Sequence, residues 1–244
     1  MPMYKKRYRS MIWLTAILLM VQMSMISQSH AQLAEGYPRT IDALQKRYAD
    51  EIMAHRKYTA YSKQACSEGY RNIAHLFKTL AASEGVHARN FKKILSDLGV
   101  KTDPSLISAK INVGSTSHNL KHAATVERDE IDREYPEILD AIRPENHQQA
   151  MMYINYAWQA EKQHRDLIVK LQKAAVRWFG IIVNRVEGKD TTYYVCQVCG
   201  STLNEKPEKN CPISGSPVSE YREIEHWPLK DCPRYVEVEE DPGD

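Results

Sequence analysis

Two Glu-x-x-His pairs constrain the fold of this chain more than any other feature of its sequence. Each pair is preceded by a single glutamate, 33 residues upstream in the first half of the chain and 34 residues upstream in the second. Residues three apart lie on one face of a helix, so each pair directs a carboxylate and an imidazole at a shared point. The complete set is Glu51 with Glu84 and His87, and Glu127 with Glu161 and His164. Four carboxylates and two imidazoles are enough to hold two metal ions inside a four-helix bundle.

The hydrophobic pattern predicts the four helices that such a bundle needs. Apolar residues recur at helical spacing between Thr40 and Asp97, and Gly69 divides this stretch into two helices. A third helix is predicted over 119–142 and a fourth over 145–179. The two halves therefore form a degenerate internal repeat of helical hairpins, each with one glutamate on its first helix and one Glu-x-x-His on its second.

The two predicted hairpins are separated by a long connection. Residues 104–117 contain Gly114 and several serine and threonine residues, a composition typical of a loop. A connection of this length would let the chain cross over the bundle before its second half. Within the third helix, Pro136 predicts a kink or a local break.

The recurring glutamates favour a metal site over a set of exposed charges. A carboxylate in a helical core is costly unless it pairs with a cation. Any one of these glutamates alone is more simply a surface charge on an amphipathic helix, but two sets with matched spacing are hard to explain in that way. Iron and manganese suit mixed carboxylate and imidazole ligands. Glu130, three residues after Glu127, either adds an extra carboxylate to the set or is a solvated charge.

Residues 1–31 have the pattern of a secretory signal peptide. Basic residues precede a mostly apolar stretch from Met11 to Ile26, which is short for a membrane span. Ser29 and Ala31 are small residues at the positions that cleavage after Ala31 requires. We therefore predict an exported, periplasmic protein. The alternative is a protein anchored in a membrane by an uncleaved N-terminal helix.

The charge balance argues against a nucleic-acid partner. The whole chain has 33 Lys and Arg against 31 Asp and Glu, and the predicted leader contributes four basic residues and no acidic ones. Without the leader, 29 basic residues face 31 acidic ones, so no electrostatic case for nucleic-acid binding remains.

Four of the five cysteines fall near the C-terminal end of the chain, where a Cys-x-x-Cys indicates a metal site. The stretch from Thr191 to Glu225 is rich in Pro, Gly and Cys and is too short to depend on a hydrophobic core alone. It predicts a small β module held together by a metal. An odd number of cysteines does not suit a complete disulfide framework. Cys66, inside the first helix, is predicted to be a buried and inert thiol.

Taken together, these residues make the chain resemble the rubrerythrin family, in which a ferritin-like di-iron bundle carries a rubredoxin-like module. The resemblance covers about Leu44 to Ile224 and includes both Glu-x-x-His pairs. The further motifs that carry it are Ala49-Asp50-Glu51, Ala54 and Tyr58-Thr59 in the first helix and Glu127, Glu130 and Tyr135-Pro136 in the third. It implies a mostly α fold: a ferritin-like four-helix bundle over 38–179, a rubredoxin-like β metal-binding module over 190–226, and a C-terminal tail over 227–244.

The resemblance also implies roles for individual residues. Tyr58 and Tyr135 would hydrogen-bond carboxylate ligands, which orients and tunes a metal site; the alternative is that both belong to the bundle core. On oxidation of the site, His87 would be exchanged for Glu130. The implied ligands of the di-iron centre are Glu51, Glu84, His87, Glu127, Glu130, Glu161 and His164.

The implied function is an exported non-haem di-iron peroxidase that reduces hydrogen peroxide to water with electrons passed through the module. The implied cofactors are two iron ions in the bundle and one iron or zinc ion in the module, although manganese also suits the bundle ligands. The implied partners are hydrogen peroxide, an electron-donor protein of unknown identity, and a second copy of the chain in a homodimer, where the module of one subunit can lie near the di-iron site of the other. The alternative function is a protein that oxidises and sequesters Fe(II), with a structural C-terminal module.

The cysteine module departs from the family pattern at one position. Cys196-x-x-Cys199 fits the pattern, but the second half reads Cys211-Pro-Ile-Ser214, with serine in place of the fourth cysteine. A hydroxyl has a far higher pKa than a thiol, so serine binds a metal as a stabilised alkoxide or weakly as an alcohol. Three alternatives stay open at this point: an oxygen ligand from Ser214, a replacement ligand from Cys232 or His226, or a redox-inactive module that zinc or a partial disulfide holds together.

Overall fold

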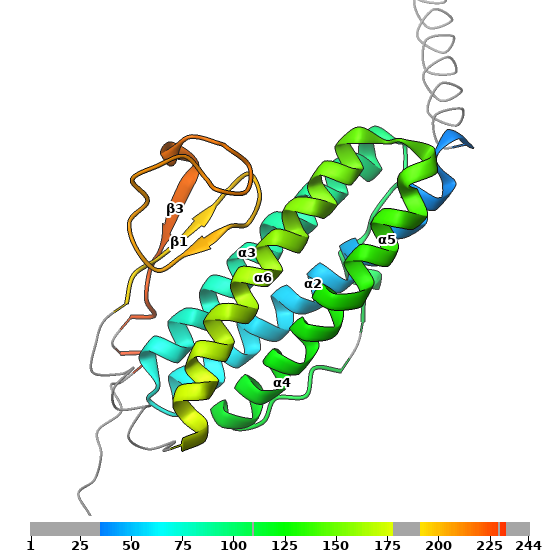
Figure 1. Ribbon diagram of the computed structural model, residues 1–244. Coiled ribbons are helices and arrows are strands. Elements are labelled where there is room, and N and C mark those ends of the chain that lie inside the picture. The colour runs from blue at the N-terminus through cyan, green and yellow to red at the C-terminus, as the bar shows by residue number, and fades with distance from the viewer. Residues whose placement is uncertain (1–34, 109, 178–190, 229, 233–244) are drawn as a thin grey trace, which may run out of the picture.

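The computed structural model describes residues 35–108, 110–177, 191–228 and 230–232, with the side chains of 126–130 and 171–177 left aside (Figure 1). The predicted leader, the linker between bundle and module, and the acidic end of the chain lie outside these residues. None of the helices in the described part of the chain combines the length and the apolar character that a membrane crossing requires.

The fold is a helical bundle with a small β module against its side (Figure 1). The long helices are α2 (Pro38–Ser67), α3 (Arg71–Asp97), α4 (Thr116–Asp129), α5 (Tyr135–Ile142) and α6 (Gln148–Arg177), with short helical turns at Pro104–Leu106, Arg143–Glu145 and Val218–Glu220. Helices α4 and α5 together form the third rod of the bundle. The predicted ferritin-like architecture is confirmed.

Glycines with a left-handed backbone conformation end α2 and α3, and a glutamate side chain caps the start of α2. Gly69 and Gly99 have φ angles of 83° and 77°, which glycine adopts without steric cost and which end α2 and α3. Glu145, in the turn between α5 and α6, accepts the backbone N–H groups of Arg39 and Thr40, both at 2.8 Å, and so caps the N-terminus of α2.

The third rod is interrupted by a π-helical turn, Glu130–Glu134, between α4 and α5. The sequence predicts a kink or break at Pro136, but the irregularity comes before this residue. Pro136 lies in the first turn of α5, a position that does not need its missing N–H group. Single π turns of this kind often accompany functional sites.

The bundle core has two apolar halves with a polar layer between them. One half, near the α2–α3 turn, contains Tyr58, Phe77, Leu80 and Ile168. The other half includes Leu44, Phe91, Ile94 and Ile154. On α2, α3 and α6 the predicted metal ligands lie between the residues that belong to the two halves. Packed apolar layers on both sides thus fix the height at which the acidic side chains meet.

The small module is a three-stranded antiparallel sheet in the order β2–β1–β3. Its strands are β1 (Tyr193–Cys196), β2 (Thr202–Leu203) and β3 (Tyr221–Ile224), with Tyr194 opposite Leu203 and Glu223. Val195 and Ile224 pack on Val86 of α3. The module of this chain therefore lies directly on its own bundle.

Candidate dimetal centre and cysteine site

Three helices bring the predicted ligands together at the polar layer. Glu51 of α2, Glu84 and His87 of α3, and Glu161 of α6 each place a ligand atom within 4.8 Å of the others. His164, one turn after Glu161, joins them with its Nδ1 2.9 Å from Glu161 Oε2. All five residues are at most 4% exposed.

Both imidazoles point Nδ1 into this group of carboxylates. His87 Nδ1 lies 3.0 Å from Glu84 Oε2 and 3.2 Å from Glu161 Oε1. His164 Nδ1 lies 3.4 Å from Glu84 Oε1. The two rings face each other with their centroids 6.1 Å apart. Glu84 and Glu161 thus each contact both histidines, as ligands shared by two metal ions would.

The outer nitrogens of the two rings fix their tautomers. His87 Nε2 lies 3.2 Å from the carbonyl oxygen of Cys199, which only accepts, so this nitrogen carries the hydrogen. His164 Nε2 lies 3.3 Å from Thr202 Oγ1, whose own hydrogen is donated to the carbonyl of Gly200. In the neutral rings both Nδ1 atoms therefore present lone pairs to the carboxylates.

Lone pairs that face buried carboxylates require a cation between them. His87 Nδ1 and Glu84 Oε2 are buried and make no well-oriented hydrogen bond despite their proximity. A metal ion satisfies both atoms at once and offsets the cost of burying several carboxylates. The donor set, carboxylates with imidazoles, suits iron. The residues thus fit a dimetal centre.

The pKa values show the same demand for positive charge. Burial raises the pKa of Glu51 to about 7, even though His87 acts in the opposite direction. Burial lowers the pKa of His87, but the nearby carboxylates of Glu161, Glu51 and Glu84 outweigh it and hold the pKa well above the usual range. The carboxylates act in the same way on His164.

Tyr135 supports the centre from α5. Its hydroxyl donates to Glu51 Oε1 at 3.0 Å, the contact that the family resemblance implies. Sequence reasoning missed Arg47, which is only 2% exposed. Its guanidinium carbon lies 5.2 Å from the centroid of the Tyr135 ring, and its Nη2 lies 2.9 Å from Glu134 Oε2. Its only sequence signal is a cation four residues before Glu51. Tyr58 is fully buried and stacks on Phe77.

The third rod carries the remaining predicted ligands. Glu127 lies in the last turn of α4, and Glu130 begins the π-helical turn. Their side chains are outside the described set, so their roles as ligands stay predictions. The exchange of His87 for Glu130 on oxidation also stays a prediction.

The small module touches the dimetal centre through its first cysteine turn. Gly200 follows Cys199 with a φ angle of +79°, and Ser83 donates to its carbonyl at 2.7 Å. A Cβ atom at Gly200 would collide with His87 Nε2 and lie 2.7 Å from Ser83 Oγ. Only glycine therefore allows the backbone of the module to approach His87 so closely. No sequence signal predicted this contact within one chain.

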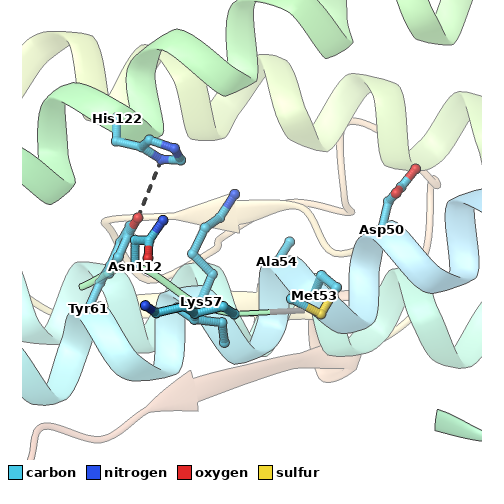
Figure 2. Close-up of a pocket in the computed structure, with 9 residues that line it drawn as sticks. Asp50, Met53, Ala54, Lys57, Tyr61, Asn112 and His122 are labelled. Atoms are coloured by element: carbon cyan, nitrogen blue, oxygen red, sulfur yellow. Dashed lines mark hydrogen bonds between the residues drawn. The ribbon is translucent and has the colours of Figure 1, made fainter. Parts of the chain in front are cut away.

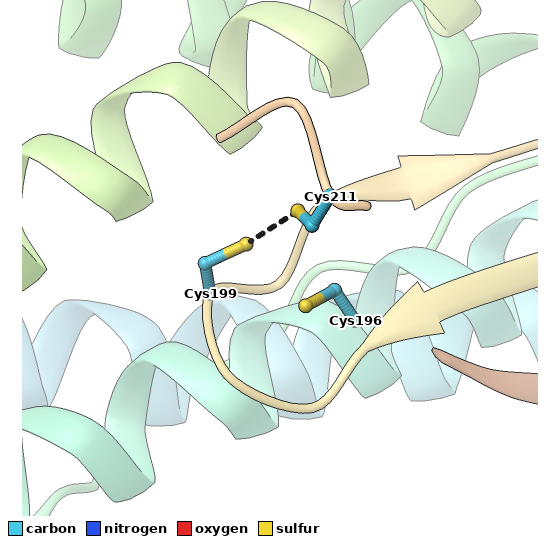
Figure 3. Close-up of side chains that lie close together, drawn as sticks. All are labelled: Cys196, Cys199 and Cys211. Atoms are coloured by element: carbon cyan, nitrogen blue, oxygen red, sulfur yellow. Dashed lines mark hydrogen bonds between the residues drawn. The ribbon is translucent and has the colours of Figure 1, made fainter. Parts of the chain in front are cut away.

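Three cysteines of the module converge on a second site (Figure 3). Cys199 Sγ lies 3.4 Å from Cys211 Sγ, and Cys196 completes the trio; all three are buried. Hydrogen bonds with Cys196 and Cys199 lower the pKa of Cys211, whereas hydrogen bonds with Cys196 and Cys211 raise that of Cys199. Thiolate donors arranged in this way suit iron or zinc.

Two hydroxyls lie where a fourth thiolate would be expected. Ser214 Oγ is 3.8 Å from Cys196 Sγ, and Ser216 Oγ is 3.3 Å from it. The two hydroxyls are 2.7 Å apart. Ser216 was not predicted to take part. Cys232 and His226 lie elsewhere: Cys232 belongs to the core half near Cys66, and the ring of His226 contacts that of His75. The structure thus speaks against either as the fourth ligand.

A polar pocket of about 260 Å³ opens between α2, α4 and residues 110–112 (Figure 2). Asp50 and Ala54, which line it, flank Glu51 in the sequence of α2. At the end of the pocket away from Asp50, Tyr61 Oη lies 3.3 Å from His122 Nδ1. The pocket therefore lies on the α2–α4 side of the bundle, while the module covers α3 and α6.

Comparisons with known proteins agree with this geometry. A sequence model of the rubrerythrin family matches residues 42–172. Rubrerythrin-2 of Clostridium acetobutylicum is 35% identical over 179 residues, which are 72% of this chain and 91% of that protein. Nigerythrin of Nitratidesulfovibrio vulgaris is 26% identical over 178 residues, 73% of this chain and 83% of the relative.

Solved structures share the fold. Nigerythrin in its fully reduced, all-ferrous state superposes with a TM-score of 0.63 at 25% identity, over 75% of this chain and 86% of the other. A bacterioferritin of Desulfovibrio desulfuricans superposes with a TM-score of 0.58 at 18% identity, over 64% of this chain and 91% of the other, and shows the shared bundle alone. Because the family model matches more than half of the chain and a curated relative is 35% identical across most of both proteins, this protein belongs to the rubrerythrin family.

Proposed function

We propose that this protein is an exported peroxidase that reduces hydrogen peroxide to water at the dimetal centre, with electrons passed through the cysteine module. Members of the rubrerythrin family are oxidoreductases with a di-iron site. The observation that carries the proposal is the position of His87, which turns Nδ1 to the carboxylates and Nε2 to the backbone of Cys199.

The buried glutamates and histidines would hold two iron ions. When bound, the pair of ferrous ions supplies the two electrons that convert one hydrogen peroxide and two protons into two water molecules. The protein positions the donors: Tyr135 orients Glu51, and the carbonyl of Cys199 and the hydroxyl of Thr202 orient the two imidazoles. The two apolar core halves keep bulk water away from both sides of this layer.

The contact between His87 and Cys199 supports electron transfer within one chain. The sulfur of Cys199 would bind the module's metal, and its carbonyl oxygen accepts the hydrogen of His87 Nε2 at 3.2 Å. The two sites are therefore joined by one residue and one hydrogen bond. A route between subunits of a homodimer, which the family resemblance also allows, is not needed for this contact.

The pocket on the α2–α4 side is the approach that we propose for peroxide. Its lining residues Asp50 and Ala54 are neighbours of Glu51 along α2, and none of its lining residues belongs to the module. A larger side chain at Ala54 reduces this space. We expect Ala54→Leu to slow reoxidation by peroxide several-fold without a loss of bound iron, and unchanged reoxidation would contradict this route.

The decisive experiment follows reoxidation of the iron-loaded, fully reduced protein by stopped-flow absorption. We expect peroxide to reoxidise it at least tenfold faster than dioxygen at equal concentration. Reoxidation that is faster with dioxygen, with iron retained as a ferric deposit, would favour the alternative function of Fe(II) oxidation and sequestration.

Export is a separate part of the proposal, supported by the leader pattern of residues 1–31. Expression of the full chain in a Gram-negative host should give a periplasmic protein whose mass corresponds to a chain beginning at Gln32. A membrane-bound protein that retains residues 1–31 would instead support the anchored alternative.

A further inference from the structure

The segment that leaves the small module returns to the end of the bundle and is held there by several contacts. This C-terminal strap comprises residues 225–228 and 230–232. Trp227 donates from Nε1 to Ser62 Oγ at 2.8 Å, and Lys78 lies 4.9 Å above its ring. The ring of His226 contacts that of His75 at a tilt of 40°, with a centroid distance of 3.7 Å. The strap thus fixes the exit of the module to α2 and α3.

The strap also brings the two remaining cysteines into one buried cluster. Three of the five cysteines form the metal-binding trio, which leaves Cys66 of α2 and Cys232 of the strap. Cys66 is 4% exposed and Cys232 is 1% exposed, and both belong to the same core half. They are 166 positions apart in sequence, so only the return of the strap can explain their meeting.

The backbone next to Cys232 limits how far apart these two cysteines can be. Cys66 Sγ donates to the carbonyl oxygen of Asp231 at 2.8 Å. In a trans peptide this oxygen lies about 2.8 Å from the next Cα atom, so Cys66 Sγ lies within about 5.6 Å of the Cα atom of Cys232. Disulfide-bonded cysteines have Cα atoms about 4.4–6.8 Å apart, a separation that small side-chain and strap movements can reach from here.

We propose that Cys66 and Cys232 are a redox pair that forms an intramolecular disulfide and fastens the strap to α2. In thiol–disulfide exchange with a small disulfide donor, one protein thiolate attacks the donor and releases one small thiol. The second protein thiolate then displaces the other. Two protein thiols and one donor disulfide become one protein disulfide and two small thiols, so electrons and protons balance. The bond would hold the module, and with it Cys199, against the dimetal centre.

Peptide mapping of the metal-loaded full chain tests the pair directly. The protein is incubated with either oxidised glutathione or dithiothreitol, denatured, alkylated without reduction and digested with trypsin. Cleavage after Lys63 and Arg71, and after Lys230 and Arg234, releases the two cysteines in peptides 64–71 and 231–234. We expect these two peptides to be cross-linked in the oxidised sample and separate in the reduced one.

Three results would overturn the proposal. One is recovery of both peptides in alkylated form after oxidation, and a second is a link from Cys232 to a cysteine of the trio. A third is a stable mixed disulfide of either cysteine with glutathione. The map uses the unaltered chain and does not depend on peroxide reduction, so it can fail or succeed independently of the proposed function.

Thermal unfolding of two serine variants provides the second measurement. Oxidation of the natural chain should raise its unfolding midpoint by roughly 5–10 °C, because the bond closes a long loop. Cys66→Ser and Cys232→Ser should both lose this increase and keep the same bound metal, since neither cysteine belongs to the trio. An equal increase in either variant would mean that the stabilisation comes from another site.

Discussion

The dimetal centre and the cysteine site differ in how the chain builds them. The donors of the dimetal centre come from three helices and lie as far apart in sequence as Glu51 and His164, so their geometry depends on the packing of the whole bundle. The cysteine trio comes from two short turns of one sheet. In those turns Gly200 and Gly215 have positive φ angles, and backbone N–H groups bond within each turn. One site is a product of tertiary structure, and the other is a product of local structure.

The two sites also differ in the ligands that the sequence supplies. Every described ligand of the dimetal centre is of the expected type, whereas the cysteine site has two hydroxyls beside three thiols. Damage to one site should therefore leave the other intact unless it breaks the contact through His87. The four predictions that follow test this independence, beginning with the largest expected effect.

Removal of a shared carboxylate should abolish the dimetal centre alone. Glu84 contacts both His87 and His164, so Glu84→Ala removes one of the two carboxylates that these imidazoles share. We expect loss of the two bundle irons and a fall in peroxide reduction of more than about 100-fold. The metal of the cysteine module should remain, which metal analysis and the visible spectrum measure. Glu137→Gln, at an exposed position of α5, is the control and should change neither quantity.

A methyl group at Gly200 should separate the two sites without destroying either. In Gly200→Ala the new Cβ collides with His87 Nε2 and crowds Ser83, in addition to the cost of a positive φ angle. Gly215→Ala is a matched control, because its φ angle is +71° and a Cβ there meets nothing within 4 Å. Both variants should lose about 1–2 kcal/mol from backbone strain.

Only Gly200→Ala should slow electron transfer from the cysteine site to the bundle irons, by roughly tenfold, because the intervening hydrogen bond is weakened. Single-turnover reduction with a donor that reacts at the module measures this rate, and metal analysis shows whether both sites stay loaded. Equal electron-transfer rates in the two variants would show that the contact between His87 and Cys199 does not carry the electrons.

The sequence predicted the dimetal centre well because its signal is local to each helix. A spacing of three residues defines one helical face wherever the helix lies, so the Glu-x-x-His pairs could be interpreted before the fold was known. The helix ends were predicted with similar success where glycine stops them, as at Gly69 and Gly99. The π-helical turn at Glu130–Glu134 was not predicted, because the sequence signal used for this helix was Pro136, which lies after the turn.

Contacts between distant segments could not be predicted from the same patterns. His87 and Cys199 are 112 residues apart, and no periodicity relates a helix face to a turn in a separate module. Arg47 is similar: an arginine on a helix ordinarily faces water, and here the acidic Asp50 and Glu134 and the ring of Tyr135 make its burial favourable. Ser216 lacked any signal because a serine in a turn is ordinary.

The third prediction concerns the fourth ligand of the cysteine site. It tests whether the same two turns that supply the three thiols also supply this ligand. Ser214→Cys restores four thiols around one point. We expect a ferric visible spectrum typical of four thiolates, a higher reduction potential than in the natural chain, and unchanged iron in the bundle. Ser216→Cys, two residues away and closer to Cys196, is the control that shows which hydroxyl occupies the fourth position. A rubredoxin-like spectrum from Ser216→Cys alone would assign that position to Ser216.

The smallest effect should come from the phenol that supports Glu51. Tyr135→Phe removes the hydrogen bond of 3.0 Å to Glu51 Oε1 but keeps the ring beneath Arg47. A hydrogen bond to a carboxylate that binds metal orients it without holding the ion, so the loss should be about 1–2 kcal/mol, or roughly tenfold in iron affinity. Competition with a chelator measures this affinity.

The matched control for the phenol is Tyr61→Phe, which loses a contact with His122 in the pocket. It should leave iron affinity unchanged. The metal of the cysteine module should bind equally well in both variants, because Tyr135 lies in α5 and its hydroxyl and ring contact Glu51 and Arg47 of the bundle. If Tyr135→Phe also lowered the affinity of the module for its metal, the two sites would be coupled through more than the single contact at His87. The cysteine site would then depend on the packing of the bundle and could not be regarded as a product of local structure.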